Sequence, residues 1–150
     1  MTPLKLIALD AEDLQVLSAH LQDAVMRVED MTYLKGERRF AAVANRFDWG
    51  SVDAATNAKD EAIRRRSGLR FERVQKAQVS NLNLGAKDAV LSLLAIAFEP
   101  QNEPEGIVTL HFSGGAAIRL TVDCIEAELS DLGAAWSTKN IPAHGGDPAP

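Results

Sequence analysis

Two alternating stretches on either side of a Gly-Gly pair constrain the fold of this chain most strongly. Residues 108–112 alternate apolar and polar side chains, and residues 118–122 do so again after Gly114 and Gly115. Successive side chains of a strand point to opposite faces, so this alternation is typical of strands that cover a core with one face. Glycine accepts the backbone angles of a tight turn. The pattern predicts a β-hairpin and a largely antiparallel fold.

The N-terminal residues predict a strand followed by a helix. Residues 4–9 suit a short opening strand, and Asp10 is placed to cap a helix that ends near residues 20–22. Leu14 and Leu17 have helical spacing, and Leu9 and Leu14 occupy the two positions of a hydrophobic staple.

The middle of the chain is rich in strand signals. Residues 24–28 and 31–34 favour strand, with a bend or bulge at 29–30 between them. A turn at Lys35 and Gly36 then returns the chain as a strand over 38–47. These segments predict a second hairpin.

Four further segments complete the prediction. Strand character resumes at 69–74, and the nearly continuous apolar stretch 89–98 predicts a central strand covered on both faces. Residues 51–63 are small and polar, which favours a mobile loop or a frayed helix. For residues 123–132 a short helix is favoured over a bulged strand, because their apolar residues share one helical face.

These elements define an α+β class with one domain over residues 1–136. The expected architecture is a strongly bent, mainly antiparallel sheet or partial barrel, with an N-terminal helix and a short C-terminal helix. A pleckstrin-homology-like barrel, whose final helix plugs one open end, is the leading candidate. The Pro/Gly-rich tail over residues 137–150 is expected to be disordered.

Composition narrows the class of partner. The net charge of −5 argues against general binding to nucleic acid. No apolar run approaches the roughly 20 residues of a membrane-spanning helix, so no membrane association is expected. Acids at residues 10–13 interrupt any signal-peptide pattern, which predicts a cytoplasmic protein. Cys124 is the only cysteine, so no intramolecular disulfide can form.

No motif for catalysis stands out. The chain has no phosphate-binding glycine loop followed by Lys and Ser or Thr, no dinucleotide fingerprint and no nucleophile elbow. His20, His111 and His144 each lack a second His or Cys at a metal-ligand spacing. We therefore expect no catalytic residue, no metal site and no cofactor, and an enzyme is the less favoured class.

The one uneven charge distribution is basic. Arginines flank the strand over 38–47 and precede the next strand, around a tryptophan. Arginine offers a planar fork suited to carboxylate or phosphate, and tryptophan offers a stacking face. The predicted ligand- or partner-binding residues are Arg38, Arg39, Arg46, Asp48, Trp49, Arg64, Arg65 and Arg66. The alternative is a solvated face on which these arginines pair with nearby acids such as Glu37 and Glu72.

Several segments together suggest a family. Residues 4–14, 37–40, 45–49, 91–96 and 124–127 carry the resemblance, in order along the chain. With these segments the sequence resembles the bacterial domain-of-unknown-function family numbered 2948, found mainly in alphaproteobacteria. The resemblance spans nearly the whole chain except the tail. It implies a stand-alone cytoplasmic bacterial protein, and it brings no assigned activity or catalytic residue.

Three functional hypotheses follow. The leading one is a non-enzymatic interaction domain whose basic, Trp49-bearing surface binds an acidic protein partner or a small phosphorylated ligand. The second is a small enzyme or metabolite-binding protein with a pocket inside the curved sheet, near His111. The third is a self-associating structural domain, because exposed strand edges invite pairing into a homodimer.

Overall fold

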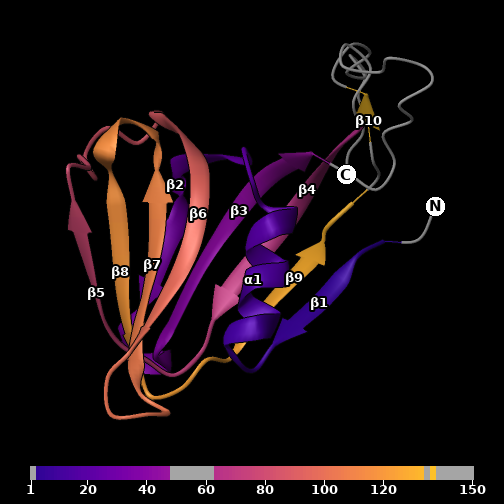
Figure 1. Cartoon of the computed structure of the whole chain (residues 1–150). Helices are drawn as coiled ribbons and strands as arrows, with labels where there is room; N and C mark the ends of the chain where they lie inside the picture. Colours follow the sequence, from indigo (N-terminus) through magenta and orange to yellow (C-terminus); the bar gives the residue numbers. More distant parts are fainter. Residues whose placement is uncertain (1–2, 48–62, 134–135, 138–150) are drawn as a thin grey trace.

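The computed structural model describes residues 3–47, 63–133 and 136–137 of the chain (Figure 1). Its one α-helix, α1, spans Ala11–His20, and two 3-10 turns span Lys35–Glu37 and Ser113–Gly115 within these ranges. The strands are β1 (Lys5–Ala8), β2 (Val25–Leu34), β3 (Arg39–Phe47), β4 (Ile63–Phe71), β5 (Val74–Ser80), β6 (Val90–Pro100), β7 (Gly106–Phe112), β8 (Ala117–Val122), β9 (Ala127–Asp131) and β10 (Trp136–Ser137).

The strands form one open, curved sheet in the order β1-β9-β4-β3-β2-β6-β7-β8-β5, with β10 paired to β4. Every pairing is antiparallel. Curvature brings the start of β5 back to the β2–β3 turn, where the Val74 amide donates to the Arg38 carbonyl at 2.9 Å. The predicted α+β class, with its bent antiparallel sheet and N-terminal helix, is confirmed.

The concave face of the sheet holds the core. Along β3 the buried residues Phe40, Ala42 and Ala44 alternate with half-buried ones, as a sheet with one covered face requires. The helix α1 lies across this face near β1 and β6 (Figure 1) and buries Leu14 and Leu17 there. The convex face of β2, β3, β4 and β9 lies on the far side of the sheet from α1; we call it the outer face.

The predicted helix and both hairpins are confirmed. The Asp10 carboxylate caps α1 by accepting from the Asp13 amide at 2.8 Å. At the β7–β8 turn, Gly114 and Gly115 have φ of 78° and 81°, the left-handed region that glycine enters without strain. At the β2–β3 turn the left-handed residue is Arg38, with φ 54°.

The helix favoured over residues 123–132 is wrong. Residues 127–131 form β9, which lies between β1 and β4 and pairs with both. Two flanking strands satisfy its backbone groups, and this tertiary pairing outweighs the helical spacing of its apolar residues. No other α-helix follows α1 in the described ranges, so the pleckstrin-homology-like assignment, which needs a final helix, is not confirmed.

A second correction concerns β6. It is central, as predicted, but it is covered on one face only. Leu93 and Ile96 are buried, whereas Val90 and Leu94 are 56% and 49% exposed. An apolar stretch with a bulge between residues 93 and 95 mimics a strand buried on both faces.

Some predictions fall outside the described residues. Of the predicted loop over 51–63, Ile63 belongs to β4 and the remainder is not described, nor are residues 138–150 of the predicted tail. In the part of the chain that is described, no helix has the length and apolar character needed to cross a membrane.

Candidate functional site

The alternation of β4 divides the predicted arginines between its two faces. Arg65 is buried on the concave face, whereas Arg64 and Arg66 lie on the outer face. On β3, Arg46 is also buried on the concave face. The structure therefore brings these four arginines together at one end of the β3–β4 pair but gives them different surroundings.

The two buried arginines surround one carboxylate, that of Asp131 on β9. Arg46 Nη2 donates to both Asp131 oxygens at 3.0 Å, and Arg65 Nε lies 3.7 Å from Oδ2. The same carboxylate accepts from the Ser67 hydroxyl and from the Leu4 amide, each at 2.7 Å. We call these four side chains, Arg46, Arg65, Ser67 and Asp131, the buried clamp; they join the three strands β3, β4 and β9 and are almost fully buried.

Arg38 and Arg39 lie at the opposite end of β3. Arg38 pairs with Asp123 at 2.6 Å, and Arg39 pairs with Glu72 and Glu37 at 2.8 and 3.0 Å. This arrangement is the ion-paired, solvated face that the sequence left as an alternative. Asp48 and Trp49 lie outside the described residues.

The two outer-face arginines, Arg64 and Arg66, form no ion pair with a carboxylate of the described ranges. The Arg64 guanidinium stacks over the Phe47 ring at 3.8 Å from its centroid, and its Nη1 donates to the Asn45 carbonyl at 3.2 Å. Partial burial lowers the pKa of Arg64 from its ordinary value. No ion pair or side-chain hydrogen bond joins Arg66 to another residue of the described ranges.

A large bulge in β2 opens the sheet beside Arg66. Met26 faces Ala44 and Met31 faces Ala42, so residues 27–30 of β2 stand opposite one residue of β3. Within the bulge β2 stays with the chain before β6: the Val28 amide donates to the Ala89 carbonyl at 3.1 Å. The predicted irregularity at 29–30 is confirmed, and it separates β2 from β3.

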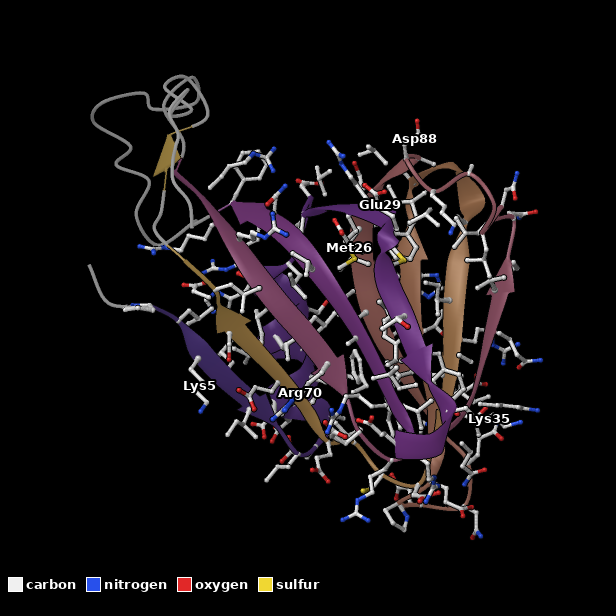
Figure 2. All side chains as sticks on the ribbon, turned by 180° about the vertical axis from the view of Figure 1, so that it is seen from behind. Lys5, Met26, Glu29, Lys35, Arg70 and Asp88 are labelled. Atoms are coloured by element: carbon white, nitrogen blue, oxygen red, sulfur yellow. The ribbon has the colours of Figure 1, made fainter. Side chains whose placement is uncertain are left out.

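The opening left by this bulge is a hollow of about 430 Å³ on the outer face. We call it the bulge hollow; its lining consists of three valines and the polar residues Arg27, Glu29, Asp30, Asn45 and Arg66. Asn45 and Arg66 are direct cross-strand neighbours, so their side chains lie close together on one face. Figure 2 looks onto this face, with Glu29 labelled at the bulge of β2.

An apolar groove of about 390 Å³ adjoins the bulge hollow and shares Asp30 and Val43 with it. Small side chains, including Ala41 and Ser130, form its base, and Arg70 and Glu128 lie at its polar margin. Arg70 Nη2 and Glu128 Oε1 form a short ion pair. Arg70 is labelled in Figure 2 on β4.

The pKa of the Glu128 carboxyl reports on the contacts at the polar edge of the groove. A hydrogen bond from the Ser130 hydroxyl at 2.8 Å, together with the charge of Arg70, lowers the pKa of Glu128, although burial opposes the shift. A carboxyl with a lowered pKa in the folded state adds stability above its unfolded-state pKa. That stability is lost as the pH falls through the folded-state pKa.

We expect Ser130→Ala to raise the pKa of Glu128 toward its ordinary value, because the hydrogen bond from the Ser130 hydroxyl favours the charged carboxylate. Carboxyl-detected NMR titration of wild type and variant measures the change. An unchanged Glu128 midpoint would show that Arg70 and Lys5 hold the carboxylate without the hydroxyl. Serine at residue 18, whose hydroxyl accepts from the Ile96 amide, provides the control substitution Ser18→Ala.

Sequence reasoning missed most of the hollow. It found Arg66 but not Arg27, Asn45 or the two acids. These residues line the hollow only because β2 bulges away from β3, and the size of that bulge cannot be predicted from composition. It also missed Asp131, the partner of the buried arginines. One signal was available in the sequence. Side chains of a strand alternate between its two faces, so Arg65 could have been predicted to lie on the face opposite Arg64 and Arg66.

Within residues 3–47 and 63–133, no cluster of three or more His, Cys, Asp or Glu side chains could hold a metal ion.

Comparison with known proteins identifies a family without a described function. The family model described as "Protein of unknown function (DUF2948)" matches residues 4–144, and the chain belongs to this family. No curated protein and no solved structure matches the chain.

Proposed function

We propose that this protein is a non-enzymatic binding domain that captures a small ligand through an anionic group, carboxylate or phosphate, in the bulge hollow. Arg66 is the principal cation of the proposed site, and the Asn45 amide lies beside it. Of the eight residues predicted from sequence, Arg66 alone both faces this hollow and lacks a carboxylate partner in the described ranges.

The unpaired state of Arg66 carries this proposal. Most of the described arginines have a carboxylate within 4 Å, including Arg27 and Arg70. A guanidinium in a recess with a free fork can offer two parallel donors to one carboxylate or phosphate. The recess favours a small ligand over a flat protein surface, because small-molecule sites are concave and hold a few converging polar groups.

The alternative pocket inside the curved sheet has less support. The concave face is filled by core side chains, among them Phe71 and Phe112, and His111 is exposed on β7. Self-association through the edge strands β1 and β5 is the third alternative, and the recess at Arg66 supports a small ligand instead.

Arg66→Gln tests the proposal. We expect inorganic phosphate to shift the backbone amide NMR signals of Asn45 and Arg66 in the wild-type chain. The variant should weaken binding about tenfold or more, because hydrogen bonds to charged groups contribute about 1.5–3 kcal/mol. Two-dimensional ¹H–¹⁵N spectra over a phosphate titration measure both effects.

Arg119→Gln is the matched control, since Arg119 is also an exposed strand arginine without a carboxylate partner in the described ranges but lies outside the hollow. The control should bind phosphate as the wild type does. Shifts that survive Arg66→Gln, or that disappear equally in Arg119→Gln, would contradict a specific site at Arg66.

A further inference from the structure

The bulge hollow contains charges of both signs. Arg27 and Arg66 supply two cations, and Glu29 and Asp30 supply two carboxylates. Arg27 and Glu29 pair with each other at 3.4 Å. Arg66 and Asp30 remain, and no ion pair joins either of them to another residue of the described ranges. One recess thus presents an unpaired cation and an unpaired anion.

Because of this balance, a ligand with charges of both signs should bind more tightly than a purely anionic one such as phosphate. A simple anion at Arg66 is attracted by the guanidinium but repelled by Asp30 across the same recess. A ligand that carries a positive and a negative group can pair with Asp30 and with Arg66 at the same time. Complementary charges of this kind set specificity more than they set raw affinity.

The groove adds a third recognition element. It begins at Asp30 and Val43, which it shares with the bulge hollow, and continues over apolar and small residues such as Ala41. In an α-amino acid the side chain and the ammonium group leave the same carbon. An ammonium group at Asp30 therefore places the side chain at the start of the apolar groove.

We propose that the ligand is an α-amino acid with an apolar side chain. Its carboxylate binds Arg66 and Asn45, its ammonium group binds Asp30, and its side chain lies along the groove. This inference rests on the proposed function, because it assigns the anionic group to the same Arg66 site. The combined volume of the two recesses, about 430 and 390 Å³, lies in the range of small-ligand sites.

Isothermal titration calorimetry of the full chain with four probes tests the assignment: leucine, 4-methylpentanoate, 3-methylbutylamine and glycine. The second probe lacks the amino group of leucine, the third lacks the carboxylate, and glycine lacks the side chain. Leucine should bind at least about tenfold more tightly than each of the other three, since each loses one charged or apolar contact.

The outcomes separate the two proposals. Equal binding of leucine and 4-methylpentanoate overturns the amino-acid assignment and leaves an anion site at Arg66 in place. Equal binding of leucine and glycine overturns the role of the groove and so the apolar side chain. Binding of none of the four probes, with phosphate shifts still present at Arg66, overturns the inference alone. Absence of both overturns the proposed function as well.

Variants locate the ammonium site. Asp30→Asn should reduce leucine affinity about tenfold while 4-methylpentanoate binds as well as before or better, because only the ammonium contact and the repulsion are lost. Asp88→Asn is the matched control: Asp88 is an exposed acid near the bulge (Figure 2) that is not part of the hollow lining. Equal losses in both variants would overturn the role given to Asp30.

A groove variant provides an independent measurement. Ala41→Leu fills the groove with an apolar side chain and leaves the charges of the hollow unchanged. We expect leucine to bind about fivefold or more weakly while glycine is unaffected, since only the larger ligand needs the groove. Circular dichroism melting of each variant confirms that the fold is retained. Unchanged leucine affinity in a folded variant would overturn the groove assignment.

Discussion

Asp131→Ala is expected to lower the free energy of unfolding by about 3–5 kcal/mol, because removing one partner of a buried ion pair leaves the other charge uncompensated. The Asp131 carboxylate is fully buried, and so is the Arg46 guanidinium at 2% exposure. Without the carboxylate, Arg46 and Arg65 face each other across the end of the core with no anion between them in the clamp. Urea unfolding followed by fluorescence or circular dichroism measures the loss.

The position of Asp131 enlarges this effect. Its carboxylate accepts from the Leu4 amide before β1, from Arg46 on β3 and from Ser67 on β4, while its own backbone belongs to β9. Substitution therefore disturbs four neighbouring segments at once. We expect the amides of β1, an edge strand, to lose protection from hydrogen exchange first, because β1 has strand pairing on one side only.

Two further variants sharpen the test. Arg46→Met should cost less than Asp131→Ala, because Arg65 remains near the carboxylate at 3.7 Å. Glu128→Gln is the control on the same strand: Glu128 lies on the outer face and its ion pairs are partly exposed, so the loss should stay below about 1 kcal/mol. A loss of that small size for Asp131→Ala would mean that water or another group replaces the carboxylate.

The buried clamp and the bulge hollow show how strand alternation assigns similar residues to different tasks. Arg65 and Arg66 are adjacent in sequence, yet one stabilises the interior and the other faces an open recess. A triple Arg64–Arg66 substitution would therefore mix a folding defect with a binding defect. Single outer-face substitutions such as Arg66→Gln avoid this, because Arg66 is exposed and contributes little packing.

The elements that could be predicted from sequence are those specified by residues close together in the chain. The capping carboxylate of Asp10, the glycine turn at 114–115 and the alternation of β7 and β8 each specify their structure within a few residues. The early helix, both hairpins and the irregularity at 29–30 could therefore be predicted from sequence.

Elements set by distant partners could not be predicted in this way. Residues 127–131 carry both helical and alternating apolar spacing, and only the presence of β1 and β4 on either side decides for strand. The bulge hollow likewise depends on how far β2 departs from β3, a property of two strands and the chain before β6 together. Asp131 could not be matched with Arg46 because 85 residues separate them.

Gly106→Ala is expected to lower the free energy of unfolding by about 3 kcal/mol, as overpacking at a close approach does. Gly106 is a buried residue at the start of β7, paired with Pro100 and Val122. A Cβ atom there would meet the Phe98 ring and lie 2.6 Å from the Glu99 carbonyl oxygen. The backbone angle of Gly106 is not in the left-handed region, so the cost arises from crowding rather than from conformation.

A glycine in open space provides the control. Nothing lies within 4 Å of a Cβ built on Gly36, and its φ is not positive, so Gly36→Ala should change stability by less than about 1 kcal/mol. Combining Gly106→Ala with Phe98→Ala separates the two contacts, because removing the ring relieves one clash and leaves the Glu99 carbonyl in place. The double variant should therefore lose less than the sum of the single variants. Strict additivity in urea unfolding, or a Gly106→Ala midpoint equal to that of the wild type, would show that β6 can shift to accept a methyl group and that the close approach is not required by the fold.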